Sequence, residues 1–361
     1  MNTLFVKTES KKYPIHCEDG FSNLAEAFRK IKLEKAKVCI VTDDNVSKLY
    51  LQEVKEILQI IFDEVHEFIF EHGETNKNLS TVEKMYTACA DFKLDRKSVI
   101  VALGGGVTGD MAGFVAATYM RGIRYIQIPT SLLAQVDSSV GGKTGIDFHE
   151  HKNMIGSFYQ PEFVYINIST LKTLPPREFS SGMAEIIKHG CIYDEYYLNY
   201  IYQNKNEIKN LAQETLKNIV LGSCKIKADV VAEDEREQGI REVLNFGHTF
   251  GHAIESLSGF SLSHGESISI GIVMAMNLSQ KIGGISADEV NKVTDILSFF
   301  ALPTKYDAID ADLIYKQMHL DKKTKNNQLT IIVLNRMGEA FQNNQIKESD
   351  ILECICQGAN A

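Results

Sequence analysis

Short apolar strands alternate with amphipathic helices along the first half of the sequence, and this alternation constrains the fold more than any other feature. Apolar runs predict strands at 37–42, 66–70, 98–103, 124–128 and 163–168. Helical patterns lie between them, at 46–58, at 79–92 and in a segment that runs to Met120. Short apolar strands joined through helices are typical of a parallel sheet covered on both faces. The first half is therefore predicted to be an α/β domain.

The character of the sequence changes at the proline pair Pro175-Pro176. Beyond it, helical periodicity predominates at 177–189, 210–237, 248–257, 265–281, 287–300 and 349–356, with one β element at 328–334. A chain of 361 residues exceeds what one hydrophobic core usually holds. We therefore expect two domains, an α/β domain over 1–174 and a mostly α-helical domain over 175–361.

The charge balance and the cysteines narrow the class of protein. The formal net charge is −9, which argues against nucleic acid or a membrane surface as a partner, because both require a basic footprint. No apolar run reaches the length of a membrane span, and the N-terminal residues lack the pattern of a signal peptide. The seven cysteines have scattered spacings, so we expect reduced thiols and a cytoplasmic location.

A glycine-rich turn follows the strand predicted at 98–103. The segment 104–110 reads GGGVTGD, and a helix is predicted to follow it. Glycines at such a turn let a phosphate approach the backbone, and the helix N-terminus favours its negative charge. A tight structural turn is the alternative, and three successive glycines favour the ligand. The later run Gly141-Gly142-Lys143-Thr144 is not an ATP-binding loop, because Asp137 stands where that motif needs glycine.

Two further loops follow predicted strands, at 43–45 and at 73–77. Carboxylates at the carboxyl end of parallel strands often bind ribose hydroxyls. Spacing alone favours the simpler interpretation, in which both are ordinary polar loops.

Histidines are concentrated in one part of the second half. His248 and His252 are four residues apart and would share a helix face, and His264 follows at the start of another helix. Thr249 stands where a zinc-protease motif would carry glutamate, so that motif is excluded. Three histidines in a short span still indicate a catalytic metal site, which needs about three protein ligands. Glu185 lies on an otherwise small and apolar helix, and its pattern fits a metal ligand and an exposed position equally well.

Basic residues recur in the same segments of this acidic chain. They are Arg121, Lys143, Lys152, Lys188, Lys227, Arg241 and the pair Lys322-Lys323. Each alone fits a surface charge. If they converge, they indicate a substrate that carries phosphate or carboxylate.

Several of these segments together resemble the 3-dehydroquinate synthases, a family of sugar-phosphate cyclases. The resemblance spans nearly the whole chain and rests on GETNK, GGGVTGD, YMRG, IPTSLLAQVDSSVGGKTGID, HKNMIGSFYQP, GMAEIIKHG, REVLNFGHTFGHAIE and SHGESISIG. It implies a Rossmann-like N-terminal domain that binds NAD and a helical C-terminal domain that holds one divalent metal, zinc or cobalt. It also implies a homodimer, in which Arg121 serves the partner's site.

The resemblance assigns a role to individual residues. It makes Glu185, His248 and His264 the metal ligands. It gives catalytic roles to His252, Lys143, Asp137, Asn245 and Arg241, and substrate contacts to Arg121, Asn153, Lys188, Lys227 and Lys322, with Lys323 as the alternative to Lys322. It places NAD contacts at Asp43, Asn45, Gly73, Glu74, Lys77, Gly106, Val107, Thr108, Gly109, Asp110, Thr130, Ser131, Lys143, Lys152, Thr170, Leu171, Lys172 and Thr173.

The implied reaction converts 3-deoxy-D-arabino-heptulosonate 7-phosphate to 3-dehydroquinate and phosphate. A ring hydroxyl is oxidised transiently with NAD, phosphate is eliminated, the ketone is reduced, and an intramolecular aldol reaction closes the carbocycle. Three alternatives compete with this function: a sister cyclase such as 2-deoxy-scyllo-inosose synthase, a metal-dependent polyol dehydrogenase, and a non-catalytic NAD-binding protein. Asn245 and the segment VGGKTGID favour the dehydroquinate branch over the sister cyclase. The dehydrogenase needs no phosphate-binding residues, so Lys152, Asn153 and Lys188 argue against it. A non-catalytic protein with a structural metal would require a fourth ligand.

Overall fold

The chain folds into two compact units. The computed structural model describes residues 2–31, 33, 36–149, 151–259, 261–306, 310–321 and 329–359. The first unit comprises Met1–Leu174 together with Leu216–Glu235, and the second comprises Pro175–Thr215 and Arg236–Ala361.

The segment Leu216–Glu235 departs from the simple division at residue 174. It forms most of helix α8 (Gln213–Glu233), which the sequence places in the second domain. Specific bonds attach it to the first unit. Lys217 Nζ lies 2.6 Å from Asp19 Oδ2, and the Cys224 thiol donates to the carbonyl of Gln135 at 3.2 Å. These partners are distant in sequence, so the helical pattern of α8 could not indicate the unit to which it belongs.

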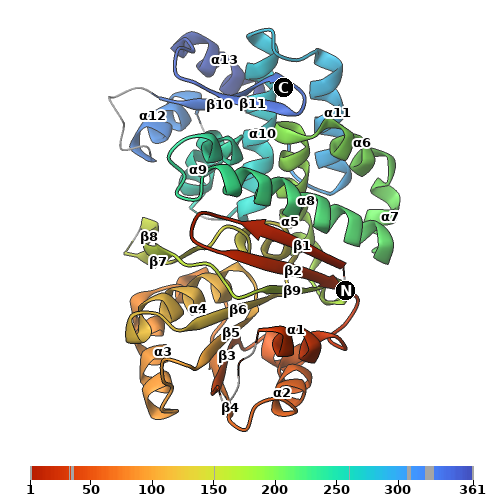
Figure 1. Ribbon diagram of the computed structural model, residues 1–361. Helices are drawn as coiled ribbons and strands as arrows, with labels where there is room; N and C mark the ends of the chain where they lie inside the picture. Colours follow the sequence, from red (N-terminus) through yellow and green to blue (C-terminus); the bar gives the residue numbers. More distant parts are fainter. Residues whose placement is uncertain are drawn as a thin grey trace. The chain divides into compact units, whose positions relative to one another are not determined.

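A seven-stranded sheet forms the centre of the first unit (Figure 1). Its strands in spatial order are β1 (Asn2–Lys7), β2 (Lys12–Glu18), β9 (Val164–Asn167), β6 (Arg124–Pro129), β5 (Val99–Gly104), β3 (Val38–Asp43) and β4 (Val65–Phe70). Every neighbouring pair is parallel except β1 with β2. The predicted parallel sheet is thus confirmed, and the β1–β2 hairpin extends it at one edge.

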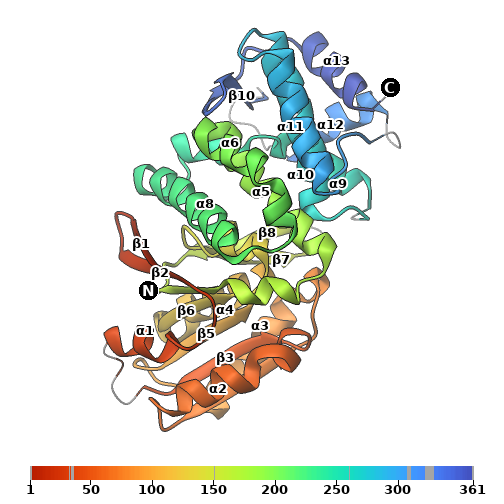
Figure 2. The same cartoon turned by 90° about the vertical axis from the view of Figure 1, so that its right-hand side faces the viewer.

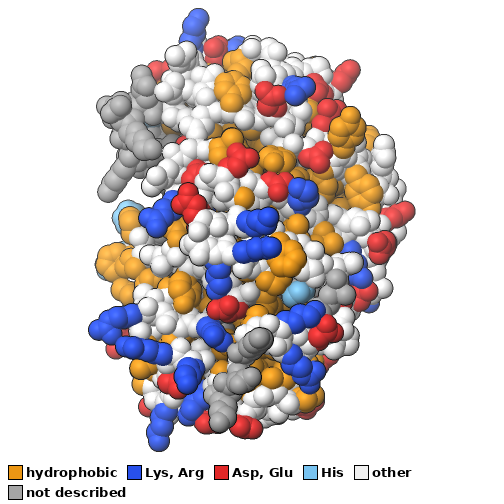
Figure 3. Space-filling model, viewed as in Figure 1, with side chains coloured by type: hydrophobic (Ala, Val, Ile, Leu, Met, Phe, Trp, Pro, Cys, Tyr) orange, Lys and Arg blue, Asp and Glu red, His pale blue; other side chains and the backbone are white. Residues whose placement is uncertain are grey.

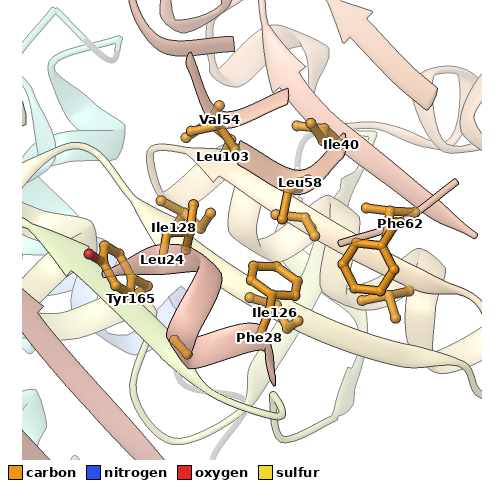
Figure 4. Packing of buried hydrophobic residues seen from close by; sticks show 14 of the residues in the cluster. Leu24, Phe28, Ile40, Val54, Leu58, Phe62, Leu103, Ile126, Ile128 and Tyr165 are labelled. Atoms are coloured by element: carbon orange, nitrogen blue, oxygen red, sulfur yellow. The ribbon is translucent and has the colours of Figure 1, made fainter. Parts of the chain in front are cut away.

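Helices cover both faces of this sheet, which explains why its central strands are apolar throughout. On one face, α1 (Leu24–Lys30) and α2 (Gln52–Gln59) place Phe28 and Leu58 against Ile40 and Ile126 of the sheet (Figure 4). On the other face, α3 (Leu79–Asp91) and α4 (Gly106–Thr118) contribute the buried residues of a second cluster, which includes Met111. The strands are therefore buried from both sides.

The order of the strands creates a reversal between β3 and β5. The chain passes from β3 outward to β4, returns to β5 on the other side of β3, and continues to β6 and β9. The first connections after β3 and β5 thus run to opposite faces of the sheet. Ligands in open parallel sheets bind beyond the carboxyl ends of strands at such a reversal. The loops that begin at Asp43 and at Gly104 flank this position.

A separate hairpin completes the first unit. Strands β7 (Lys143–Phe148) and β8 (His151–Phe158) pair antiparallel, so the run at 141–144 leads into a strand. Gly142, at φ +70°, precedes it. The hairpin packs on α4 of the same unit, where a side chain at Gly113 would meet Thr144.

The second unit is mostly helical, as predicted. Its helices are α5 (Pro176–Tyr193), α6 (Glu195–Gln203), α7 (Lys205–Lys209), α9 (His248–Leu257), α10 (His264–Lys281), α11 (Ala287–Phe299), α12 (Ala311–Asp321) and α13 (Glu348–Ala359). A small hairpin of β10 (Ile331–Arg336) and β11 (Glu339–Asn343) accompanies them. Helix α10 contacts α5, α9, α11 and α13, so it forms the centre of this unit (Figure 2).

The surface carries charges of both signs. On the face seen in Figure 3, Lys and Arg side chains are interspersed with Asp and Glu side chains and are not gathered into one large basic area. Among the described helices, none has the length and apolarity needed to cross a bilayer.

Candidate active site

Small residues bring three helices of the second unit together. A Cβ at Gly271 of α10 would lie 2.1 Å from the carbonyl oxygen of Gly247, which is the residue before α9. A Cβ at Gly265, near the start of α10, would lie 2.3 Å from Cα of Ser181 in α5. No side chain larger than hydrogen fits at either position. The glycines therefore let α10 approach both α5 and α9 closely.

This approach assembles Glu185 of α5, His248 of α9 and His264 of α10. One ligand atom from each of these side chains lies within 4.8 Å of the others. Oε1 of Glu185 is 3.7 Å from Nε2 of His248 and 3.7 Å from Nε2 of His264. Ligand atoms around a tetrahedral zinc ion, at bonds of about 2.0–2.1 Å, lie about 3.3 Å apart. The three side chains thus need only a small contraction to hold such an ion.

Glu185 is the least solvated member of this group, with a side chain 1% exposed. Its Oε1 is buried and accepts no hydrogen bond from the described residues. A buried carboxylate oxygen without a hydrogen bond is costly, and a cation would relieve that cost. The donor set of one carboxylate and two imidazoles suits zinc or cobalt.

The charges around the group set the protonation of its members. Burial acts to raise the pKa of Glu185, but Lys188, His264 and His248 outweigh it and hold that pKa well below the usual value. Burial, followed by the charge of Lys188, lowers the pKa of His248 well below its usual value. Glu185 is therefore ionised and His248 neutral near pH 7, which are the forms that bind a metal. Burial acts to lower the pKa of His264, but Glu185 and Glu255 outweigh it and raise that pKa to about 9, so His264 releases a proton when a metal binds.

His252 and Glu255 lie beside these three residues. The His252 ring centroid is 5.2 Å from that of His248 and 6.0 Å from that of His264. Ligand atoms of His252, Glu255 and His264 also lie within 4.8 Å of one another, so the geometry alone offers a second candidate ligand set. The first set is the better ion site, because its carboxylate is more deeply buried and one of its oxygens accepts no hydrogen bond from the described residues.

Two predicted residues precede α9 in the 3-10 helix η6 (Ile240–Asn245). Arg241 is almost wholly buried there, and Asn245 Nδ2 donates to Glu237 Oε1 at 3.2 Å. Gly247 then adopts φ +78° and starts α9. Arg241, Asn245 and the ligand His248 thus occupy one continuous segment.

The predicted NAD contacts of the first unit lie at the carboxyl edge of its sheet. The parallel strands are β3, which ends at Asp43, and β4, β5, β6 and β9, which are followed by Gly73, Gly106, Thr130 and Thr170. The backbone of Thr130 donates to the carbonyl of Gly104 at 2.9 Å, which joins two of these loops. The edge therefore collects segments that are widely separated in the sequence.

The glycine-rich turn has the local structure that a phosphate requires. Gly105 is the N-cap of α4 and offers no side chain, so the first N–H groups of α4 are left for a ligand or water. A Cβ at Gly106 would lie 3.2 Å from Ser138 Oγ, which leaves little room for one. A pyrophosphate fits such a glycine-lined helix N-terminus.

Lys77 links several of the predicted residues. Its Nζ lies 2.7 Å from Asp110 Oδ2, 3.8 Å from Glu74 Oε1 and 2.5 Å from Asn153 Oδ1. Burial acts to lower the pKa of Lys77, but Asp110 and Glu74 outweigh it and raise that pKa. The charged lysine thus connects α4, the β4 loop and the β8 strand.

Other predicted contacts have structural roles in this conformation. Asp43 Oδ1 accepts from the backbone N–H groups of Asn45 and Val46, at 2.9 Å each. The Thr170 hydroxyl accepts from Gln135 Nε2 at 3.0 Å, and Leu171 is buried in the core.

The exposed predicted residues occupy loops and the β7–β8 hairpin. They are Lys143, Lys152 and Asn153 of the hairpin, and Arg121, Lys172 and Thr173 elsewhere in the first unit. Met120 and Arg121 have φ of +51° and +68°, a strained conformation for residues with side chains. Strain of this kind concentrates at functional sites.

Asp137 and Lys227 are joined directly. Lys227 Nζ donates to the carbonyl oxygen and to Oδ1 of Asp137, at 2.7 Å each. Asp137 lies in the π-helical turn η4 (Ala134–Ser138), and such turns are frequent at functional sites. Lys322 and its alternative Lys323 lie outside the described residues.

Comparison with known proteins identifies the family. The 3-dehydroquinate synthase N-terminal family matches residues 67–181, and the corresponding C-terminal family matches residues 182–324. The 3-dehydroquinate synthase of Ruminiclostridium cellulolyticum is 45% identical over 350 residues, which cover 97% of each chain. That of Acetivibrio thermocellus is 46% identical over 343 residues, which cover 95% of each.

Solved structures show the same fold in related cyclases. A 2-deoxy-scyllo-inosose synthase, complexed with carbaglucose-6-phosphate, NAD⁺ and Co²⁺, is 25% identical with a TM-score of 0.89, and the match covers 99% of this chain and 100% of the other. The 2-epi-5-epi-valiolone synthase of Streptomyces hygroscopicus, with NAD⁺ and Zn²⁺ bound, is 23% identical with a TM-score of 0.88 over 98% of each chain. These structures support the fold predicted from the sequence, while identity is far higher to the dehydroquinate enzymes. The chain belongs to the 3-dehydroquinate synthase family.

Proposed function

We propose that the chain is an NAD- and metal-dependent 3-dehydroquinate synthase, a lyase that converts 3-deoxy-D-arabino-heptulosonate 7-phosphate to 3-dehydroquinate and phosphate. Family membership supports the reaction. The single structural observation that carries the proposal is the group of Glu185, His248 and His264. In this group a buried carboxylate oxygen lies 3.7 Å from each of two imidazole nitrogens, close to the spacing of ligands around a catalytic divalent ion.

The second unit supplies the residues that would act on the reacting carbon. When bound, a zinc or cobalt ion held by Glu185, His248 and His264 supplies Lewis acidity, and NAD supplies reversible hydride transfer. His252 is the neighbouring imidazole and is half-buried, so it can exchange protons with a substrate hydroxyl. The side chain of Lys188 is buried against Glu185 and would contribute a cation for an anionic substrate.

The first unit supplies the residues that would bind the cofactor. The N–H groups at the start of α4 would bind the pyrophosphate, and Asp43 at the end of β3 and Glu74 after β4 would offer carboxylates to the ribose hydroxyls. Lys77 fixes the side chain of Asp110 beside this turn. The cations Lys143, Lys152 and Lys227 belong to the same unit and suit the carboxylate and phosphate of the substrate.

A second copy of the chain is the proposed partner. Met120, Phe148, Met154 and Phe158 are large hydrophobic residues that are exposed on the β7–β8 hairpin and the adjoining end of α4. Tyr159 at the end of the hairpin donates to the carbonyl of Ile123 at 2.7 Å, which fixes the hairpin next to that end of α4. Burial of this surface between two copies would give the homodimer. Met154→Glu with Phe158→Glu should then yield monomers in sedimentation experiments, and an unchanged dimer would exclude this surface.

The thiols bear on the cellular location. All seven cysteines are free, which fits a reducing compartment, and we assign the chain to the cytoplasm.

A substrate comparison separates this proposal from its alternatives. The purified chain, with zinc and NAD, is supplied in turn with the heptulosonate phosphate, glucose 6-phosphate and glycerol. The synthase should release phosphate only from the first, and it should form no NADH from glycerol. Phosphate release from glucose 6-phosphate at an equal or higher rate would favour the inosose-forming reaction, and steady NADH formation from glycerol would favour a polyol dehydrogenase.

A further inference from the structure

Glu255 is a buried carboxylate on the metal-binding face of α9. It lies seven residues after His248 and three after His252, so all three side chains share one side of the helix. Its side chain is only 7% exposed, and its neighbours Ala253 and Ile254 are fully buried. Burial of a carboxylate is costly unless a positive charge or a hydrogen bond compensates for it. A positive charge or a hydrogen-bond donor is therefore expected beside Glu255.

The side chain of Glu255 faces the ring of His264. Oε2 of Glu255 lies 3.9 Å from Nδ1 of His264, while Nε2 of the same ring lies 3.7 Å from Oε1 of Glu185. The imidazole thus stands between two carboxylates, each opposite a different nitrogen. With its hydrogen on Nδ1, the ring presents the lone pair of Nε2 toward the group of metal ligands.

The other ligand histidine is oriented in the same way. Nδ1 of His248 lies 3.2 Å from the carbonyl oxygen of Phe246, and Nε2 of His248 lies 3.7 Å from Glu185 Oε1. Both histidines therefore direct Nδ1 to an oxygen acceptor and Nε2 to Glu185. At His248 this oxygen is a backbone carbonyl at 3.2 Å, and at His264 it is the carboxylate of Glu255 at 3.9 Å, which must come closer to accept a hydrogen bond.

We propose that Glu255 is a positioning residue, which holds His264 in the tautomer and orientation that present Nε2 to the metal. The inference rests on the proposed metal site and adds to it an acceptor outside the three ligands. Carboxylates that accept from a metal-bound histidine orient the ring and increase its basicity, and their loss usually weakens metal binding by about 10–100-fold. The alternative role for Glu255 is that of a direct ligand in the set with His252 and His264.

The test measures zinc affinity by competition with a chromophoric chelator, for the wild type, Glu255→Gln, Glu255→Asp and His264→Ala. Glu289→Gln is the matched control, because it makes the same chemical change at a capping carboxylate on α11. Thermal unfolding of each metal-free variant shows whether it folds. The enzyme activity of each variant is then measured at increasing zinc concentrations.

A positioning role predicts zinc binding about 10–100-fold weaker in Glu255→Gln, with activity that returns toward the wild-type value once zinc saturates the variant. Glu255→Asp should show a smaller loss of zinc affinity. It tests the inference if Glu255→Gln does not fold. Zinc affinity within twofold of the wild type in either folded variant would overturn the inference. Loss of zinc as complete as in His264→Ala, without recovery at high zinc, would also overturn it and make Glu255 a ligand. If the wild type itself binds no zinc, the proposed metal site fails, which is distinct from a failure of Glu255 alone.

Discussion

Glu185 and Lys188 form an ion pair on one face of α5, and their side chains are 1% and 2% exposed. The pair lies three residues apart on a helix that is buried for most of its length. It places a negative and a positive charge in the same buried surroundings, so each compensates for the desolvation of the other. The carboxylate is also a predicted metal ligand, and the pair therefore affects both stability and metal binding.

Glu185→Gln should destabilise the metal-free protein, because it leaves the Lys188 ammonium buried without its counter-charge. Loss of one partner of a buried pair costs about 3–5 kcal/mol. The double variant Glu185→Gln with Lys188→Met should recover most of that loss, since no buried charge is left. Urea unfolding in the presence of a chelator measures both values. Equal free energies of unfolding for Glu185→Gln and the wild type would contradict the account of the pair.

Gly271→Ala should separate α9 from α10 and disturb the metal site without touching a ligand. The added methyl group would meet the carbonyl oxygen of Gly247 at 2.1 Å and the nitrogen of Gly251 at 2.7 Å, and neither backbone atom can rotate away. Overpacking of this kind costs about 1–3 kcal/mol. Bound zinc after dialysis should fall together with stability. Gly20→Ala is the control, because nothing lies within 4 Å of the new methyl group there. Full zinc content in Gly271→Ala would show that zinc binding does not require the close approach of α9 and α10.

The sequence predicted the first unit well where the pattern is local. The strand predicted at 37–42 is β3 (Val38–Asp43), and the strand predicted at 98–103 is β5 (Val99–Gly104). A strand that is buried on both faces is a continuous run of apolar residues, so it can be predicted from a few consecutive residues. The β1–β2 and β7–β8 hairpins were not predicted, because their mixed residues show no comparable apolar run.

The candidate metal site also could not be predicted from local patterns alone. Spacing on one helix joined His248 with His252, and it left Glu185 equally suited to a surface position. Three helices meet at Glu185 only because glycines at 247, 265 and 271 remove side chains from their contacts. Such contacts join residues far apart in the sequence, and no single-helix pattern records them. Glu255 was missed for this reason, although its spacing from His248 placed it on the same helix face.

Lys77→Met should weaken NAD binding by more than tenfold and leave zinc binding unchanged. Lys77 contacts Asp110 at 2.7 Å beside the glycine-rich turn, and its loss leaves that carboxylate without its closest cation. If loss of this contact weakens NAD binding by about 1.4 kcal/mol, the affinity for NAD falls tenfold. Calorimetric titrations with NAD and with zinc measure the two affinities separately. Lys84→Met, an exposed change on α3, is the control. Unchanged NAD affinity in Lys77→Met would argue against the cofactor position.

One cysteine of the seven should react quickly with a thiol reagent at pH 8 in the native protein. Cys356 is exposed, and the other six are buried. Burial raises the pKa of Cys17 to about 12 and that of Cys89 to about 11, so these thiols stay protonated at pH 8, where only a thiolate reacts. Stopped-flow titration with a chromogenic disulfide counts the fast thiols. Cys356→Ser should abolish the fast phase, and two or more fast thiols in the folded wild type would contradict the packing described.

The most direct test of the central claim is a measurement of products at substoichiometric NAD. The zinc-loaded chain is incubated with 3-deoxy-D-arabino-heptulosonate 7-phosphate and far less NAD than substrate, while phosphate, 3-dehydroquinate and NADH are quantified together. A synthase that returns the hydride should release phosphate and 3-dehydroquinate in equal amounts, many per NAD, with no net NADH. Absence of phosphate release, or accumulation of NADH in step with product, would contradict the proposed function.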